Sequence, residues 1–489
     1  MSAHEEEKTE QKYSDTSTAI EDETQGSSKE VSQISKAERK LVRKINIIFL
    51  PFVLCIGMLQ TADKSALAIS GVLGIYQDTG ITGSQFSWLG SIFFLGYLLY
   101  QIPNQFFVQW FLIRRYLGTC ITLWGGVMLF TALGRTFSQL AALRFLLGFF
   151  EAANLPCIYV IIANLYRRRE HPYYFSFATM SQGVGAALGN LVAAGVSTMG
   201  NRGGIPMWRW NHIIFGALTV ALGILTCFFL VDNPRSKLLR LTPEEMHIVD
   251  LRTQDNAFVR NKRFNPKHIT EALGELRYYL IILGMIGVNM QAGGILVFSV
   301  QLIQVMGNFT ATESILFKIP GGAATFLTTL MAGLIARRTQ QTVYTGIFMC
   351  LISLSGCLVL ACIPSGTVKL LGYYLSLAAF GSSAMFATIV GSNVSGYSKK
   401  IFYNTTMTAA NTLGQFIGPL VMLDREKPRY LTGLIVFSVG NAVAIVCLVI
   451  IRIMIARENK RRIASPPPEI YDVNLDLTDQ EDRNFLYKV

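Results

Sequence analysis

The sequence contains about ten long apolar stretches between Ile45 and Ile455, most of them close to twenty residues long. An α-helix needs about twenty apolar residues to cross the hydrocarbon core of a bilayer, since each residue adds about 1.5 Å along its axis. Arginine and lysine recur at every second break between the stretches. We therefore predict an all-α polytopic membrane protein with roughly twelve transmembrane helices.

The basic breaks predict the orientation of the chain. Positive charges near span ends are retained on the cytoplasmic side of a membrane, so these breaks are expected to face the cytoplasm. The breaks between them have one basic residue or none near the membrane and are expected to face outward. The exceptions are Arg202 and Arg209, which flank Trp208, and the last outward break, Asp424 to Arg429, which mixes acids and bases. Both termini then lie in the cytoplasm. The basic clusters are at Arg114 and Arg115, at 167–169, after Asp232, at Arg337 and Arg338, at Lys399 and Lys400, and at Arg457, Lys460, Arg461 and Arg462.

Composition excludes several other classes of protein. With 51% hydrophobic and 15% charged residues among 489, the chain has far more apolar surface than one soluble core needs. A net charge of +12 would suggest nucleic acid in a soluble protein. Here the basic residues sit at membrane edges, where orientation and anionic lipid explain them. We therefore expect no nucleic-acid partner. The eight cysteines form no CxxC or Cys/His set, and we expect no metal and no cofactor.

Long polar segments divide the chain into five parts. We expect 1–44 to be a disordered cytoplasmic tail, because its glutamate, lysine, serine and threonine cannot form a core. Spans over 45–231 form an N-terminal bundle of six helices, 232–275 is a cytoplasmic linker, and 276–455 forms a second bundle of six. Residues 456–489 are a cytoplasmic C-terminal tail. Within the linker, Thr242 and Glu245 form a capping-box pattern with proline between them, which predicts a short amphipathic helix to about Asp255.

Charged residues inside the apolar stretches are the first candidates for function. Each costs at least about 2.5 kcal/mol to insert at the centre of a membrane, so it needs a compensating role. Asp63 and Lys64 lie in the first span, and Arg144 and Glu151 lie in the fourth. Arg144 and Glu151 are seven residues apart, close to two helical turns, so both point to one face. These four residues either form a functional site or neutralise one another as a structural lock. Lys318, in the eighth span, is expected to snorkel toward the outer surface.

Amide side chains in the later spans are the second group of candidates. Asn289 and Gln291 lie in the seventh span, and Asn411 and Gln415 lie one turn apart in the eleventh. Such amides either bind a carboxylate or amide substrate or hydrogen-bond neighbouring helices, and the sequence leaves both roles open. Gly185 and Gly189 have a GxxxG-like spacing, which favours close helix packing rather than a nucleotide-binding loop.

Enzymatic activity and ATP-driven transport are disfavoured. The sequence has no GxxxxGK[ST] loop and no HExxH pattern, and its five histidines are scattered. An ion gradient is therefore the expected energy source for transport.

At the intramembrane charges the chain resembles a known family. Asp63-Lys64, Arg144 to Gly148 with Glu151, Trp208-Arg209-Trp210 and the stretch from Gly391 to Lys400 are similar to the fungal anion:cation symporters related to allantoate permease. The resemblance covers about 37–455. It implies the major facilitator fold, in which two six-helix halves are parallel repeats with the substrate site between them near the midplane.

The resemblance also implies a function. Members of this family import small organic anions, vitamins or amino acids, usually with protons. By similarity, Lys64 and Arg144 would hold the substrate carboxylate. Glu151 would respond to protons, and Asp63 would share in that proton coupling or in the charge lock. Relatives often have a histidine in the second span and a basic residue in the seventh, and this chain has neither. Lysine at position 64 is a point charge that cannot bind a carboxylate in the bidentate way of arginine, so a different substrate orientation is expected.

Two other functions stay open at the level of sequence. A nutrient sensor would bind its ligand without accumulating it, but it would need more cytoplasmic surface than the tails and linker provide. A channel would need a continuous polar pore, whereas the charges here are concentrated in spans one and four.

A glycosylation sequon and the family resemblance indicate the cellular membrane in which the protein lies. Asn308-Phe309-Thr310 is a glycosylation sequon in a predicted outward loop, consistent with a secretory-route membrane. The family resemblance implies the plasma membrane, and an internal membrane stays open. We expect a monomer in a lipid bilayer, with a small organic anion and a proton as its ligands.

Overall fold

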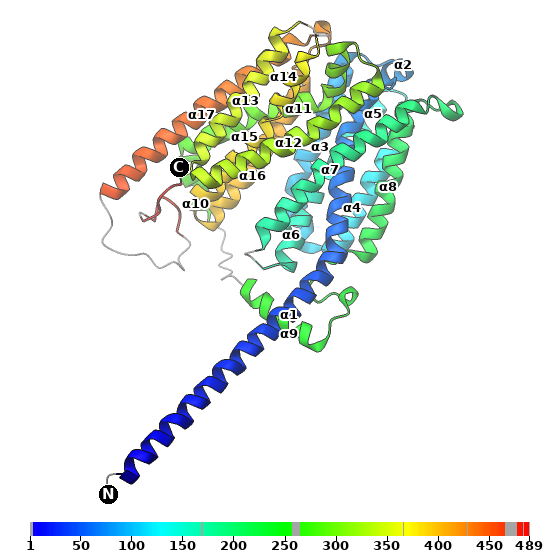
Figure 1. Ribbon diagram of the computed structural model, residues 1–489. Coiled ribbons are helices and arrows are strands. Elements are labelled where there is room, and N and C mark those ends of the chain that lie inside the picture. Colours follow the sequence, from blue (N-terminus) through cyan, green and yellow to red (C-terminus); the bar gives the residue numbers. More distant parts are fainter. Residues whose placement is uncertain are drawn as a thin grey trace.

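The computed structural model describes residues 3–167, 170–256, 265–364, 366–427, 429–464, 477–482 and 484–488. All regular secondary structure in these residues is helical (Figure 1). Nine helical segments are long and apolar enough to cross a membrane. Three further long helices pack among them: α4 (Ile113–Thr131), α7 (His171–Thr198) and α16 (Tyr397–Leu420). Together these account for the predicted twelve spans in the described part of the chain.

The first six spans form one bundle. Their order is α1 (Ala3–Ser70), α3 (Gly83–Trp110), α4, α5 with α6 (Phe137–Glu151 and Asn154–Leu165), α7 and α8 (Met207–Phe229). Short helices α2 (Ile75–Thr79) and η1 (Arg202–Gly204) lie in its connections. The second bundle contains α11 (Leu276–Gly307), α12 (Ala311–Thr339), α13 (Thr342–Cys362), α14 with α15 (Val368–Ser376 and Ala379–Asn393), α16, and α17 (Leu431–Ala464), with η3 (Asp424–Glu426) before α17.

The two bundles repeat one packing pattern. In the first bundle, the first span packs on the fifth (α1 on α7) and the third on the sixth (α4 on α8). In the second, α11 packs on α16 and α13 on α17, which are the equivalent pairs. The fourth span is broken in both bundles, between α5 and α6 and between α14 and α15. This correspondence is that of two parallel repeats.

Small residues allow the close contact between α1 and α7. A Cβ atom on Gly185 would lie 2.4 Å from Met58 Cα, and one on Gly189 would lie 2.7 Å from Ala62 Cβ. The spacing of these glycines predicted close helix packing, and the structure assigns it to the first span.

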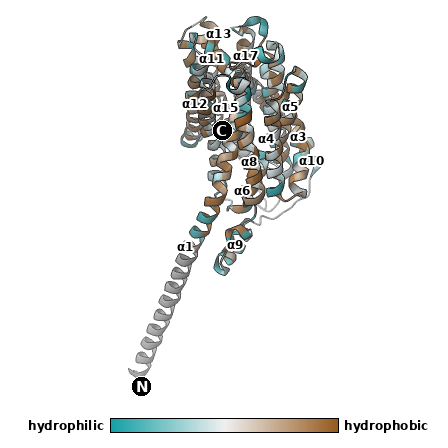
Figure 2. Ribbon diagram, turned by 90° about the vertical axis from the view of Figure 1, so that its right-hand side faces the viewer, coloured by the Kyte–Doolittle hydropathy of each residue, from teal (hydrophilic) through white to brown (hydrophobic). Residues whose placement is uncertain are grey.

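The bundle surface is apolar where lipid would contact it. Large side chains such as Leu218, Phe228, Leu327 and Leu330 are exposed on α8 and α12. Figure 2 shows hydrophobic residues along the bundle helices and hydrophilic residues mainly toward the ends. A soluble protein would not expose this much apolar surface.

The linker folds against both bundles: its first part packs on the first bundle, and its last helix packs on α11 and α16 of the second. It contains η2 (Lys237–Leu239), α9 (Pro243–Asn256) and α10 (Pro266–Leu273). Helix α9 begins where the capping box predicts it, because Glu245 N donates to Thr242 Oγ1 and Thr242 N donates to Glu245 Oε2. Ile248 and Val249 are buried in the core of the first bundle, so α9 is attached to that bundle.

The boundary of the N-terminal tail differs from the expected residue 44. Helix α1 runs from Ala3, and its first part projects away from the bundle (Figure 1). Residues 37–44 are already packed, because Leu41 is fully buried and Lys44 Nζ donates to Glu245 Oε2 at 2.7 Å. The packed chain therefore begins near residue 37, about two helical turns earlier than expected. A disordered tail before residue 37 stays a prediction.

Hydrogen bonds between the two bundles are concentrated at one end. We call this the distal end; it contains α2 and η3 and lies opposite the linker end, where α9 and α10 are found (Figure 1). Among the described residues, four of the five hydrogen bonds between the bundles lie there: Gly83 N to Asp424, Ser87 to Met422, Gln301 to Tyr76, and Ser197 with Thr312. The fifth joins Gln101 to Thr412, deeper in the bundle. The distal end is therefore closed.

Candidate functional site

The charged residues of spans one and four meet inside the first bundle. Lys64 Nζ lies 3.0 Å from Glu151 Oε1, which joins α1 to α5 through an ion pair. Glu151 is completely buried, whereas the Lys64 side chain keeps 20% exposure. The Lys64 ammonium also lies 5.6 Å from the centre of the Tyr97 ring, on α3. The lysine is therefore the group of this pair that a ligand could reach.

Asp63 and Arg144 have separate polar partners. Asp63 Oδ2 accepts a hydrogen bond from Trp124 Nε1 at 2.7 Å, which connects α1 with α4. Arg144 is 4% exposed and interacts electrostatically with Asp63 and Glu151. Two carboxylates and two cations thus balance in this buried cluster, as a low-dielectric site requires.

A histidine completes the surroundings of Arg144. Arg144 Nη2 lies 3.3 Å from His212 Nε2, and His212 Nδ1 lies 2.9 Å from the carbonyl oxygen of Trp208. Because a carbonyl can only accept, Nδ1 donates to it, and Nε2 of the neutral ring is left to accept from Arg144. His212 therefore fixes the direction of the guanidinium.

Local sequence explains why Glu151 ends its helix. Proline has no backbone N–H, and its ring clashes with the carbonyl four residues earlier. Pro156 therefore disfavours a continuous helix at Ala152, and the chain breaks between α5 and α6. Gly148, one turn before Glu151, lets α5 approach α3, because a Cβ there would lie 1.9 Å from Phe93 O. Glu151 therefore lies in the last turn of a helix packed on α3, and its carboxylate pairs with Lys64 of α1.

Several buried polar atoms around this cluster make no hydrogen bond to any described residue. They are Glu151 Oε2, Asp63 Oδ1, and the side-chain amides of Gln60 and Asn154. Gln60 lies one turn before Lys64 on α1. Buried polar atoms are rarely left without partners in native proteins, so these atoms indicate a place for water or a polar ligand.

The amides of the seventh span are engaged in the second bundle. Gln291 Oε1 accepts from Ser353 Oγ at 3.0 Å and from Asn441 Nδ2 at 2.5 Å, and its Nε2 donates to Ser376 O at 2.5 Å. Asn289 donates to Ser383 and to Met285 O. These bonds hold α11 to neighbouring helices, which favours the helix-packing role left open by the sequence.

The amides of the eleventh span are less enclosed. Gln415 Nε2 donates to Asn411 Oδ1 at 2.5 Å, and both side chains are half-buried. Thr412, between them, accepts from Gln101 Nε2 of α3 at 3.3 Å. Helix α16 therefore faces the first bundle at this depth, and Asn411 and Gln415 stay candidates for substrate binding.

Two other predicted residues lie outside the charge cluster. Lys318 is 7% exposed and its Nζ is buried without a hydrogen bond to the described residues, so it does not snorkel as expected. It shares a buried face of α12 with Ser314, Ile315 and Gly321, which directs it inward. Asn308 is exposed at the distal end, where it ends α11 with a positive φ of 53°.

With this geometry in place, comparison with known proteins decides the family. The family model described as Major Facilitator Superfamily matches residues 53–422. The chain belongs to the Major Facilitator Superfamily.

Relatives of this major facilitator protein are fungal permeases. It is 28% identical to the allantoate permease of Saccharomyces cerevisiae over 94% of this chain and 88% of that protein. The high affinity cysteine transporter of the same yeast is 25% identical, over 90% of this chain and 82% of the relative. Solved structures share the fold. A bacterial homolog of the human lysosomal transporter Spinster, inward-facing and unoccupied, superposes with a TM-score of 0.63 at 16% identity, over 82% of this chain and 94% of that one.

The family and relatives confirm a membrane transporter rather than an enzyme. The sequence did not reveal His212, Trp124 or Gln60 as members of the site. His212 lies one turn after Trp208 near the start of α8, and no sequence pattern distinguishes it from the other scattered histidines. His212 is distant in sequence from its partner Arg144, and Trp124 is distant from its partner Asp63.

Proposed function

We propose that this transporter imports a small organic anion, such as a vitamin-like carboxylate or an amino acid, together with a proton. The observation that carries the proposal is the ion pair between Lys64, whose side chain is partly exposed, and Glu151, whose side chain is fully buried. Arg144, held by His212, supplies a second fixed cation in the same cluster. Cations in a low-dielectric site attract an anion strongly.

Charge balance suggests how proton and anion are coupled. With all four groups ionised, Asp63 and Glu151 neutralise Lys64 and Arg144. A proton on Glu151 removes one negative charge and leaves Lys64 without its partner. The cluster then has an excess positive charge, which a substrate carboxylate can neutralise. Proton and anion therefore bind more favourably together than either does alone, which is positive coupling between two ligands.

The closed distal end supports an alternating-access cycle. Its four hydrogen bonds between the bundles would have to break for the cluster to open to that side. We assign the distal end to the outside, because the basic breaks lie at the other end. Both termini are then cytoplasmic, Asn308 is available for glycosylation, and closure of the distal end is what an inward-facing state requires. The plasma membrane is the proposed location.

Relatives support the substrate class. Two of the relatives are named for the compounds allantoate and cysteine, and both compounds contain a carboxylate. We propose that Lys64 and Arg144 bind that carboxylate and that Asn411 and Gln415, on the part of α16 that contacts α3, bind the remainder of the substrate. Asn289 and Gln291 act through helix packing, because their hydrogen-bonding groups are occupied.

Accumulation of labelled compounds tests this proposal. A panel of nicotinate, pantothenate, biotin, allantoate and cysteine is offered at acidic and neutral pH to cells that lack their own permeases. We expect acid-stimulated accumulation of one compound by the wild type and its loss in Arg144→Ala. Arg235→Ala, at an exposed linker arginine, is the matched control and should accumulate normally. Binding of a panel compound without any accumulation would contradict transport and indicate a sensor.

A further inference from the structure

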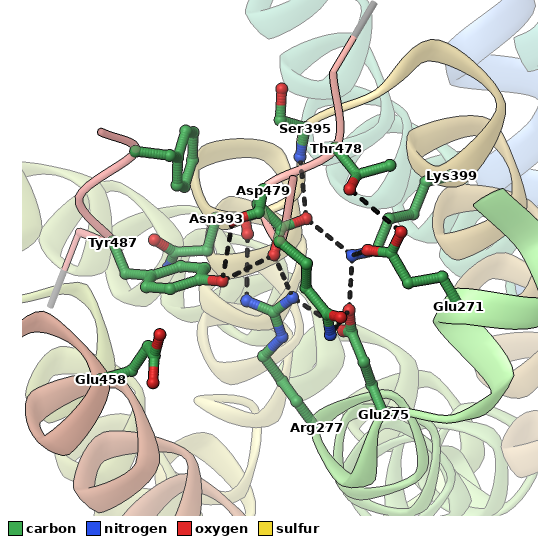
Figure 3. A network of polar contacts seen from close by, with 12 residues as sticks. Glu271, Glu275, Arg277, Asn393, Ser395, Lys399, Glu458, Thr478, Asp479 and Tyr487 are labelled. Atoms are coloured by element: carbon green, nitrogen blue, oxygen red, sulfur yellow. Dashed lines mark hydrogen bonds and ion pairs between the residues drawn. The ribbon is translucent and has the colours of Figure 1, made fainter. Parts of the chain in front are cut away.

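The last described residues of the chain are bound to the linker end of the second bundle. Residues 477–482 and 484–488 contact the starts of α11 and α16, the turn between α15 and α16, and the end of α17 (Figure 3). Thr478 and Asp479 are completely buried and Tyr487 is 7% exposed. A terminal segment with this much burial requires specific partners.

Two cations hold the carboxylate of Asp479. Oδ1 accepts from Lys399 Nζ at 2.8 Å and Oδ2 accepts from Arg277 Nη2 at 2.7 Å. Ser395 N donates to Oδ1 at 3.3 Å, and the Tyr487 hydroxyl donates to Oδ2 at 2.8 Å. Figure 3 shows both oxygens facing these donors. Charge-assisted hydrogen bonds of this length are strong, so the site selects a carboxylate at this position.

Side chains of the bundle also bind the backbone of the segment. Asn459 Nδ2 donates to Tyr487 O at 2.8 Å, and its Oδ1 accepts from Tyr487 N at 3.0 Å. Asn393 bonds Lys488 in the same two-point manner, at 2.9 and 2.6 Å. The amide of each asparagine thus replaces the neighbouring strand that an extended peptide would otherwise need.

The aromatic ring of the segment is held by two guanidinium groups. Arg277 lies 5.0 Å and Arg462 lies 4.8 Å from the centre of the Tyr487 ring. Arg462 also donates to the carbonyl oxygens of Asp482 and Phe485. Cation–π contacts favour an aromatic residue at this position.

The site keeps its charges balanced without the segment. Lys399 Nζ also binds Glu271 Oε1 at 2.7 Å and Glu275, and Arg277 Nη2 binds Glu275 Oε2 at 2.7 Å. Departure of Asp479 therefore leaves two cations with two carboxylates. No buried cation would be left unpaired, which is the usual obstacle to releasing such a segment.

We propose that 477–482 and 484–488 act as an intramolecular peptide ligand. Lys399, Arg277, Arg462, Asn393 and Asn459 recognise it as an acidic residue followed eight positions later by an aromatic one. Glu271 is on α10 and Lys399 is on α16. Thr478 Oγ1 donates to Glu271 at 3.0 Å and Asp479 accepts from Lys399, so the bound segment adds a bridge between the linker and the helix that bears Asn411 and Gln415, beside the direct pair of Lys399 with Glu271. Docking of the segment does not depend on the proposed substrate.

Hydrogen–deuterium exchange of the full-length protein in lipid nanodiscs tests this proposal. Asp479→Asn removes the charge that Lys399 and Arg277 bind. Asp482→Asn is the matched control, because the Asp482 side chain accepts only from the Asn484 backbone among the described residues. We expect slow exchange at 478–488 in the wild type and in Asp482→Asn, and exchange about tenfold faster or more in Asp479→Asn.

A second variant keeps the test independent of Asp479. Tyr487→Ala should also accelerate exchange at 478–482, because one docked unit is released as a whole. Exchange of 477–488 at the rate of an unfolded chain in the wild type would overturn the proposal. Equal acceleration by Asp479→Asn and Asp482→Asn, or a Tyr487→Ala effect restricted to its neighbours, would overturn it too.

Discussion

Lys64 of α1 and Glu151 of α5 form an ion pair of 3.0 Å inside the first bundle, and only the lysine is partly exposed. The pair therefore serves both roles that the sequence left open. It fixes α5 against α1, and it offers a cation whose partner can be neutralised by a proton. A lock of this kind would open when proton and anion bind.

A double-mutant cycle measures the lock. Lys64→Gln alone leaves the buried Glu151 charge unpaired, and loss of one partner from a buried pair costs about 3–5 kcal/mol. We expect the Lys64→Gln, Glu151→Gln double variant to be destabilised by clearly less than the sum of the single variants. Thermal unfolding of the purified proteins in one detergent checks this. Additive effects would show that the two residues do not interact.

His212 is expected to position Arg144 rather than bind substrate. His212→Ala should raise KM with a smaller effect on maximal rate, because a misdirected guanidinium weakens binding. His212→Gln retains an acceptor and should recover part of the affinity, whereas His212→Phe should not. His247→Ala, at an exposed position of α9, is the control and should behave as wild type. Equal KM for the Gln and Phe variants would contradict the role of the hydrogen bond.

Two glycines of the first bundle should respond oppositely to a methyl group. Gly148→Ala places a Cβ 1.9 Å from Phe93 O, so α5 must shift, at a cost of about 1–3 kcal/mol. Gly126→Ala, on α4, meets no atom within 4 Å and should be neutral or slightly stabilising. Thermal stability and initial uptake rate of both variants provide the measurement. If the Gly148→Ala protein is as stable and active as the Gly126→Ala protein, the close contact between α3 and α5 is disproved.

Much of this organisation could be predicted from the sequence. Length and hydropathy fix the helical spans, and the basic breaks fix their alternation, because both follow from the cost of placing polar groups in lipid. The four intramembrane charges were found for the same reason. Partners that are distant in the chain could not be predicted. His212 is 68 residues from Arg144, and Asp479 is 202 residues from Arg277, and no local pattern specifies such pairings.

The docked C-terminal segment should be insensitive to pH in the physiological range. Burial alone would raise the pKa of Asp479, but the charges of Arg277 and Lys399 outweigh it and lower that pKa from its ordinary 3.8. The stabilisation is therefore complete above this ordinary value and is lost only as pH falls through the lower pKa of the docked state. Exchange protection factors of 478–488 should be equal at about pH 7.5 and 5.

Loss of protection between these two pH values would contradict that expectation. It would implicate another group near the segment, such as His268, whose Nε2 lies 3.9 Å from Glu481 Oε2. The charged and titratable groups around the segment are His268, Glu271, Glu275, Arg277, Lys399, Tyr403, Glu458 and Arg462. The segment itself contains Asp479, Glu481, Asp482, Tyr487 and Lys488.

If a proton on Glu151 frees Lys64 to bind an anion together with Arg144, a pH gradient should drive uptake into proteoliposomes. The labelled compound accumulated by cells is supplied outside, with the outside medium acidic and the lumen neutral. We predict accumulation above the outside concentration by the wild type. Glu151→Gln, which cannot exchange a proton there, should only equilibrate the compound, although exchange of internal for external substrate continues. Wild-type uptake that does not depend on the pH gradient would contradict proton coupling through Glu151. Gradient-driven accumulation by Glu151→Gln equal to that of the wild type would contradict it too.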